Sequence, residues 1–566
     1  MTRFFLFFHF IGLTIFSIAQ YDGNTSPTYP ELIEIYKELD REHEEIELYN
    51  MGSSDYGLPI YLCVINGARD SVGTFMKAMQ GTTVLINNAI HAGEPDGINA
   101  CLIWIDNWIK AGKPSDIPLV GIIPAYNVGG MMTRSSSSRA NQNGPEEYGF
   151  RGNSQNLDLN RDFVKMDSKN MFTFAKIYQN LDPDVFIDTH VSNGADYQYY
   201  LTYIASVRER MAPSLGALMH DSLIPHLETT FSRELFPIVP YVNMKGKTPD
   251  EGIAVFNDLP RYAMGYATMM NALSFTTETH MLKPFPERVK HTQLFIEETV
   301  NWMRDNKRAI EKARFEALMW EDMLANFEYD LKVSENHDSI VFYGYEAYYP
   351  VSDVTGKELL KYDRNRPYQK EVCFYNRCVA SKEVQMPSKI ILGAQCEDVK
   401  DRLRANDIYF YPLERDTVIE SRRLRVMDFK TGNKPYEGHF LHSKVMFEFE
   451  DVEQKMKKGD VVISLDQPNK RFIMSLFVPD APDSYFSWNY FDSYVQQKEY
   501  FSSYIFDEYA EEMLKQNKAL RKEFETKKKE DKEFAESDFL QLYYLYKKSK
   551  FYEPTHNVLP YFFVEN

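Results

Sequence analysis

The hydrophobic pattern of the first half of the chain alternates between two types of segment. Residues 83–90 (TVLINNAI), 117–123 (IPLVGII) and 185–190 (VFIDTH) are apolar nearly throughout, as expected of strands covered on both faces. Residues 97–112 (GINACLIWIDNWIKAG) instead place apolar residues on one helical face and end at a glycine that can stop a helix. This alternation predicts an α/β fold, with a mostly parallel sheet and helices on both faces.

The same pattern continues through a strand-like run at residues 273–280 (LSFTTETH) and a predicted helix near residues 286–327. After residue 330 the chain changes to short β-type runs such as SIVFYGYEAYY (339–349), separated by turn residues. We therefore predict an α/β domain over residues 21–330 and a smaller β-rich domain of unknown role over residues 331–475.

The last part of the chain, residues 476–566, is predicted to be mostly helical. Its stretch EEMLKQNKALRKEFETKKKEDKEF (511–534) is rich in charged, helix-favouring residues. A solvated helical face and a partner-binding arm both fit this composition.

The N-terminus has the order of a secretory signal peptide. Arg3 precedes an apolar run, and small residues at Ser17 and Ala19 come before Gln20. We predict a signal peptide over residues 1–20, cut near Ala19 or Gln20, and a secreted or periplasmic mature protein. An uncleaved N-terminal anchor is the alternative. No later stretch is apolar enough to span a bilayer, so stable membrane insertion after signal removal is not expected.

Composition narrows the range of partners. The formal net charge is −18, which makes nucleic acids and anionic membrane surfaces poor partners. The five cysteines are too few and too scattered for a disulfide framework. Cys373 and Cys378 could pair in an oxidising compartment, although spacing does not determine the pairing. The oligomeric state is left open.

The stretch AIHAGEPDG (89–97) contains the first candidate chemistry, His91 and Glu94. Taken alone, this pair fits either an ordinary polar loop or two metal ligands. Its position favours metal, because it directly follows the predicted strand 83–90, and open α/β sheets bind ligands at the carboxyl ends of their strands.

Three further stretches add functional groups at comparable positions. The polar run RGNSQNLDLNRDF (151–163) is too hydrophilic to be core, while His190 and Glu278 each lie at the end of an apolar strand. A catalytic zinc ion takes three protein ligands and keeps one open position, and His91, Glu94 and His190 satisfy that count.

The ordered set of strand–HxxE, arginine, DLNR, strand–His and strand–TxE resembles the secreted, bacterial-type zinc metallocarboxypeptidases of the carboxypeptidase A family, over roughly residues 55–320. The resemblance implies a carboxypeptidase-like fold and a peptide substrate, hydrolysed at its C-terminal bond. It also implies one zinc ion per chain, held by His91, Glu94 and His190.

The resemblance assigns roles to the remaining residues as well. Glu278 is the implied general base that activates water, and Asp158 the carboxylate that orients the first histidine. Asn160 and Arg161 are implied to bind the C-terminal carboxylate of the substrate. Arg151 is the expected oxyanion-stabilising arginine, with Arg139 as its alternative.

Two features depart from the family pattern. The residue between the first two ligands, often basic in the family, is Gly93, and the expected turn reads NVGG at residues 127–130. Tyr262 and Tyr266 both precede Glu278, and neither is assigned as the family's mobile tyrosine. Two alternatives therefore stay open. One is a zinc amidase or deacylase acting on a small N-acyl or peptidoglycan-derived substrate, and the other is an inactive binding protein of the same fold.

Overall fold

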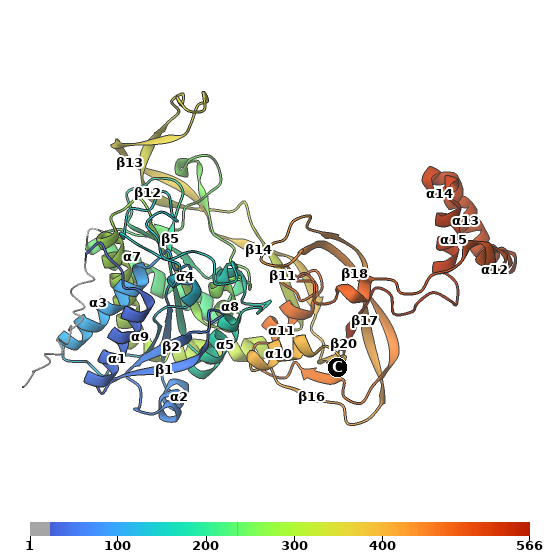
Figure 1. The fold of residues 1–566 in the computed structure, drawn as a ribbon, viewed down its shortest axis with the longest axis horizontal. Coiled ribbons are helices and arrows are strands. Elements are labelled where there is room, and N and C mark those ends of the chain that lie inside the picture. The colour runs from blue at the N-terminus through green and yellow to red at the C-terminus, as the bar shows by residue number, and fades with distance from the viewer. Residues whose placement is uncertain (1–22, 235, 566) are drawn as a thin grey trace, which may run out of the picture.

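The computed structural model describes residues 23–234 and 236–565 (Figure 1). The predicted signal peptide, residues 1–20, lies outside the described residues. An eight-stranded sheet forms the centre of what we call the first unit. Across this sheet the strands are β1 (Ile46–Ser53), β2 (Pro59–Ile65), β4 (Leu119–Ile123), β3 (Thr83–Asn87), β5 (Val185–Ser192), β10 (Leu273–His280), β6 (Leu201–Ala205) and β7 (Val239–Pro240).

The α/β class is confirmed, but the sheet is mixed. Strands β4, β3, β5 and β10 run parallel at its centre, while β2 is antiparallel to both β1 and β4, and β6 is antiparallel to β10. A short turn can join only antiparallel strands, and β1 and β2 are joined by residues 54–58 alone. The prediction of a mostly parallel sheet therefore describes only the part that helices connect.

Helices cover both faces of this sheet. α5 (Lys169–Leu181) packs Phe174 against Phe186 of β5, and α3 (Asp96–Lys110) brings Gly97 close to Thr189 of the same strand. Phe186 and Thr189 are an odd number of residues apart, so they point to opposite faces. α9 (Phe285–Asp322) shares the face of α3, and α8 (Ala263–Met269) shares that of α5 (Figure 1).

A second sheet of six strands organises what we call the second unit, together with α10 (Glu397–Ala405) and α11 (Lys470–Phe477). Its strand order is β16 (Phe410–Pro412), β19 (Val461–Ser464), β15 (Lys389–Leu392), β20 (Val558–Val564), β17 (Thr417–Thr431) and β18 (His442–Met456). β11 (Asn326–Val333) pairs with β14 (Cys378–Gln385) in the connection between the units.

Two strand pairings cross the predicted domain boundaries, which remain a prediction. The hairpin of β12 (Asp338–Tyr348) and β13 (Lys361–Tyr375) joins a four-stranded sheet with β8 (Asn243–Met244) and β9 (Ile253–Ala254) of the first unit. At the other end of the chain, β20 returns from the C-terminal segment to lie between β15 and β17.

The charged C-terminal stretch forms a small helical body that projects from the second unit (Figure 1). Its helices are α12 (Ser503–Gln516), α13 (Lys518–Glu530), α14 (Lys532–Glu536) and α15 (Asp538–Lys547). They share a core of their own around Phe506, Phe524 and Phe534. Among the described residues, no helix combines the length and the apolar character needed to cross a bilayer.

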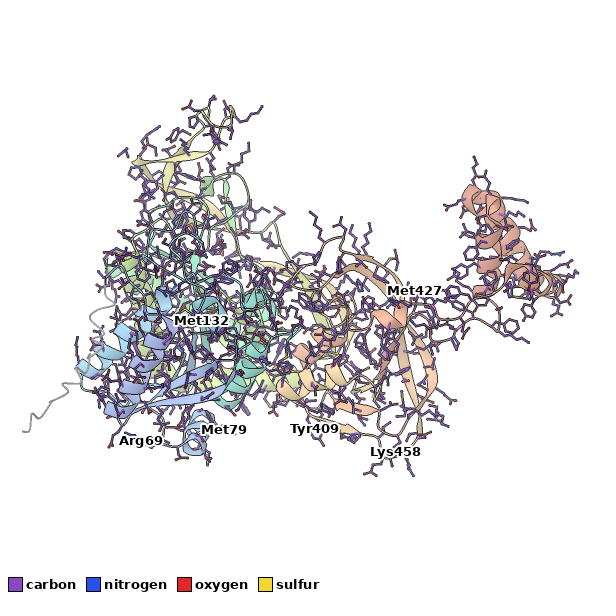
Figure 2. All side chains as sticks on the ribbon, in the orientation of Figure 1. Arg69, Met79, Met132, Tyr409, Met427 and Lys458 are labelled. Atoms are coloured by element: carbon purple, nitrogen blue, oxygen red, sulfur yellow. The ribbon has the colours of Figure 1, made fainter. Side chains whose placement is uncertain are left out.

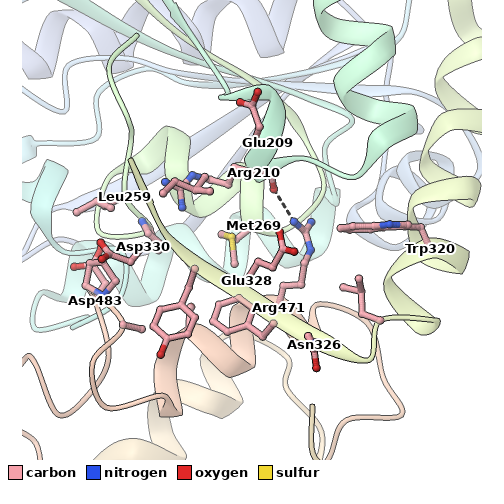
Figure 3. A pocket seen from close by; sticks show the side chains of 18 residues that line it. Glu209, Arg210, Leu259, Met269, Trp320, Asn326, Glu328, Asp330, Arg471 and Asp483 are labelled. Carbon is pink, nitrogen blue, oxygen red and sulfur yellow. Dashed lines mark hydrogen bonds between the residues drawn. The ribbon is translucent and has the colours of Figure 1, made fainter. Parts of the chain in front are cut away.

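The first unit, β11 and the second unit meet around a cavity of about 350 Å³ (Figure 3). Arg210 of the first unit, Tyr329 of β11 and Arg471 of α11 are among its lining residues, and Arg471 Nη1 donates to the Arg210 carbonyl oxygen at 2.6 Å.

Large exposed apolar side chains such as Met79 and Met427 lie far apart on the surface (Figure 2). All five cysteines are free thiols, Cys373 and Cys378 included.

Candidate active site

The structure brings the three predicted metal ligands together at the carboxyl edge of the parallel strands. The chain leaves β3 at Asn87, turns through His91 and Glu94, and enters α3, while His190 lies near the end of neighbouring β5. One ligand atom from each of the three residues lies within 4.8 Å of the others. All three are nearly inaccessible to solvent, at 3%, 2% and 4% exposure in chain order.

Both histidines turn the same ring atom toward Glu94. The Nδ1 atoms of His91 and His190 lie 3.3 and 3.1 Å from Glu94 Oε2. Their Nε2 atoms lie 3.0 Å from Asp158 Oδ1 and 2.8 Å from Asp188 Oδ2, respectively. An ionised carboxylate only accepts hydrogen bonds, so each Nε2 carries a hydrogen and each Nδ1 is the ring atom directed at Glu94. With both rings neutral, two nitrogen donors and a carboxylate oxygen would be gathered in one place, and this donor set fits a metal ion.

Neighbouring charges bias the protonation of these groups. Burial alone disfavours charge on His190, but Asp188 and Glu94 outweigh it and raise the pKa of His190 well above its usual range. Burial likewise works against ionised Glu94, yet Arg139 and His91 hold the pKa of that carboxyl well below its usual range. Ionised Glu94 is therefore stabilised by positive charge on the groups around it.

Asp188 is an orienting residue that the sequence reasoning missed. It precedes His190 by two residues on β5, so both side chains point to the same face of the sheet. The sequence VFIDTH could have indicated this role. Side chains two residues apart on a strand lie on the same face, so Asp188 can reach the Nε2 atom of His190.

Two arginines converge on Glu94. Arg139 Nη1 lies 2.6 Å from Glu94 Oε1, and its side chain is 14% exposed. Arg151 lies at the more open rim, 3.6 Å from Glu94 Oε1, and binds Asp158 Oδ2 through Nη2 at 2.8 Å. A Cβ atom at Gly93 would lie 2.9 Å from Arg139 Cδ, so the glycine leaves room for this arginine. Arg139, from a loop distant in sequence, thus supplies a basic group beside the ligands although residue 93 itself is glycine.

Glu278 lies beside the ligand cluster. It is the register partner of His190 on β10 and lines, with the three ligands, a cavity of about 270 Å³. Desolvation inside this cavity raises the pKa of Glu278 to about 7, with Glu94 adding to the rise and His190 opposing it. Asp258, which the sequence reasoning did not single out, lines the same cavity, and burial raises its pKa to about 8.

Asn160 and Arg161 contribute hydrogen-bond donors to this cavity. The backbone N–H of Ala263 donates to Asn160 Oδ1 at 2.9 Å, which leaves the Nδ2 donor of this amide for a ligand. Arg161 Nε donates to the Tyr436 hydroxyl and Nη1 to the Asn160 carbonyl oxygen, while Nη2 makes no hydrogen bond within the described parts of the chain. Both residues line the cavity.

The two tyrosines that precede Glu278 have different environments. Tyr262 lines the cavity, and its ring lies under the Arg161 guanidinium, 4.5 Å from ring centroid to Cζ. Tyr266 is fully buried and donates from its hydroxyl to Asn406 Oδ1. Tyr262 is therefore the one of the two that can contact a ligand.

No family model and no curated protein sequence matches this chain. Solved metallo-carboxypeptidases are similar to it in structure over about half its length. The metallo-carboxypeptidase of Burkholderia cenocepacia is 15% identical, with 48% of this chain and 68% of that one covered and a TM-score of 0.36. Carboxypeptidase A of Helicoverpa armigera is 16% identical, with 53% and 75% covered and a TM-score of 0.36. Bovine thrombin-activatable fibrinolysis inhibitor, in complex with tick carboxypeptidase inhibitor, is 15% identical, with 52% and 99% covered and a TM-score of 0.37.

Proposed function

We propose that this chain is a zinc-dependent carboxypeptidase that hydrolyses the C-terminal peptide bond of its substrate. The observation that carries the proposal is the composition of one cavity. It contains a metal-ligand set, His91, Glu94 and His190, together with the free donors of Asn160 and Arg161. A metal site and a carboxylate-binding pair in the same cavity suit a substrate with a free C-terminus.

The proposed ligands suit zinc, which takes nitrogen and oxygen donors and keeps an open position in catalytic sites. When bound, zinc would polarise the scissile carbonyl and acidify water. Asp158 and Asp188 hold the two histidine rings by their Nε2 hydrogens and so keep both Nδ1 atoms available as ligands.

Glu278 is the proposed general base. Its carboxyl shares the cavity with the ligand set but is not a member of it, so it is free to take a proton from the attacking water and to return one to the leaving amine. Arg151 at the rim is the proposed group that stabilises negative charge on the carbonyl oxygen, and Arg139, further inside, is the alternative.

Arg161 and Asn160 are the proposed carboxylate clamp. Arg161 offers its Nη2 donors and Asn160 its Nδ2 donor, and together they would recognise the two oxygens of a C-terminal carboxylate. Because Tyr262 and Tyr436 hold the guanidinium on its face and its Nε edge, the clamp is organised before substrate arrives. We also propose that the protein is secreted or periplasmic, on the basis of the signal peptide predicted over residues 1–20.

The first prediction compares a peptide with its C-terminal amide. Amidation removes the charge that pairs with Arg161 and leaves its Nη2 donors without a partner in the cavity, a penalty of roughly 2–5 kcal/mol. Wild-type cleavage, measured as kcat/KM, should fall by at least about thirtyfold on amidation. Arg161→Ala should weaken cleavage of the free acid strongly and of the amide little, so that the two substrates become nearly equivalent.

The exposed Arg41→Ala serves as the control and should keep the wild-type preference for the free acid. Equal cleavage of both peptides by wild type, or cleavage at internal bonds, would overturn the carboxylate clamp and leave the amidase or deacylase as the better description.

A further inference from the structure

A loop of the second unit reaches into the site described above. Residues 432–441 connect β17 to β18, and backbone hydrogen bonds between Tyr436 and His439 in both directions close the loop tip. Glu437 and Gly438 at the tip both have positive φ, 49° and 84°. Two positive φ values at the centre of a two-residue hairpin are the mark of a tight type I′ turn, which fixes the direction of its flanking side chains.

The loop tip makes three contacts with the segment that contains the DLNR motif. The Tyr436 hydroxyl accepts from Arg161 Nε at 3.0 Å, and Glu437 Oε2 accepts from the Asp158 backbone N–H at 2.7 Å. His439 Nε2 lies 2.8 Å from Asp167 Oδ2. The second unit therefore contacts both the proposed clamp and the residue that orients His91.

The ring of Tyr436 is itself fixed by packing against other residues. Its ring stacks on Trp488, a fully buried residue, with the ring centroids 6.2 Å apart and the planes at 25°. The Arg261 guanidinium lies over both rings and donates from Nε to Asp483 Oδ1 at 2.7 Å. These contacts hold the Tyr436 hydroxyl in place, so that it can restrict the Arg161 side chain.

We propose that Tyr436 is a positioning residue for substrate recognition and that the second unit thereby completes the active site. Tyr436 occupies Arg161 Nε, and the Asn160 carbonyl and Asp158 occupy Nη1. The Nη2 donors are left for a ligand in the cavity that Arg161 lines. A guanidinium without these partners would sample several rotamers, and each carboxylate bound would carry an ordering cost. The inference rests on the proposed function.

The test removes the hydroxyl alone. Tyr436→Phe keeps the ring on Trp488, so zinc content and melting temperature should stay at wild-type values. KM for a free-acid peptide should rise by about threefold to tenfold, as expected for loss of one hydrogen bond of ordinary strength that orients Arg161 without contacting the substrate, while kcat changes by less than about twofold. In an Arg161→Ala background, Tyr436→Phe should have no further effect, because the group that it positions is absent.

Tyr329→Phe is the matched control, since the Tyr329 hydroxyl donates to Asp480 Oδ1 at 2.7 Å and has no contact with Arg161. It should leave KM unchanged. An unchanged KM in Tyr436→Phe, or an equal rise in the Arg161→Ala background, would overturn the inference and leave the proposed hydrolysis standing.

A binding measurement separates this inference from the reaction itself. Calorimetry with N-acetylated amino acids, each as free acid and as amide, needs no turnover. A wild-type preference for the acid that Tyr436→Phe weakens would support the positioning role even in a protein that does not hydrolyse peptides. A wild type that binds acid and amide alike would overturn it.

Discussion

At the residue scale, the chemistry of the site depends on two carboxylates that are not among the proposed metal ligands. Asp158 and Asp188 accept the Nε2 hydrogens of His91 and His190 and thereby decide which ring nitrogens point at Glu94. Such partners are worth tenfold to a hundredfold in metal affinity or activity in known metal sites. The ligands and their orienting acids therefore act as one unit.

One substitution should remove metal binding, and another should remove catalysis while the metal stays bound. Wild type should contain about one zinc per chain by elemental analysis, and His190→Ala should lose most of it. Glu278→Gln should keep the zinc and the fold but lose hydrolysis by several orders of magnitude, because the same carboxylate both takes the proton and positions the water. His226→Ala, at a half-exposed histidine paired with Glu298, is the control and should change neither property. Near-normal turnover in Glu278→Gln would exclude it as the base.

At the scale of elements, a buried ion pair joins the metal-binding loop to the longest helix of the first unit. Asp96 begins α3, two residues after Glu94, and Arg288 lies in the first turn of α9. Arg288 Nε and Nη2 bind the two Asp96 oxygens at 2.9 and 3.1 Å, and the two side chains are 0% and 1% exposed. Arg288 also donates to the carbonyl oxygens of Asn143 and Lys283.

Breaking this pair should destabilise the protein strongly. Asp96→Ala leaves the Arg288 charge buried without its counter-ion, which costs about 3–5 kcal/mol, whereas a surface pair contributes about 0–1 kcal/mol. Urea unfolding of metal-free protein should show this loss, and Arg304→Ala, which removes an exposed ion pair on the same helix, should lie within about 1 kcal/mol of wild type. Equal midpoints for the two variants would show that the buried pair does not hold α3 against α9.

At the scale of the whole molecule, the C-terminal segment combines a projecting helical body with a strand inside the six-stranded sheet. β20 pairs with β15 on one side and β17 on the other, and it buries Leu559, Tyr561 and Phe563. In chain order the helices α12 to α15 come just before this strand, and the ends of their segment meet where the Lys498 backbone N–H donates to Glu553 Oε1 at 2.6 Å.

Two deletions should therefore have opposite outcomes. Replacing residues 500–551 by a short Gly/Ser linker should keep zinc content, activity and the melting transition near wild type, because the ends are already close together. Ending the chain at residue 556 removes far fewer residues but opens the centre of the six-stranded sheet, and should give an aggregated or partly unfolded protein by size-exclusion chromatography and circular dichroism. Loss of zinc or activity on helix replacement would show that the helical body supports the site.

The sequence by itself determined the parts of the site that depend on local order. His91, Glu94, His190 and Glu278 all follow or end apolar strands, and the carboxyl ends of parallel strands meet at one edge of a sheet. The helix expected over residues 97–112 is present as α3, with Gly112 at a positive φ of 86° just after its end. Spacing and periodicity thus carried the α/β class and the candidate ligand set, because the residues beside each ligand show that it lies at the end of a strand.

Only the tertiary structure decided what distant segments contribute. Tyr436 lies 275 residues from Arg161, and Glu437 lies 279 residues from Asp158. The space that Gly93 leaves is filled by Arg139 from another loop, and β20 crosses the predicted boundary to complete a sheet. No local periodicity encodes such contacts, because each depends on how two separately formed surfaces pack once the chain between them has closed.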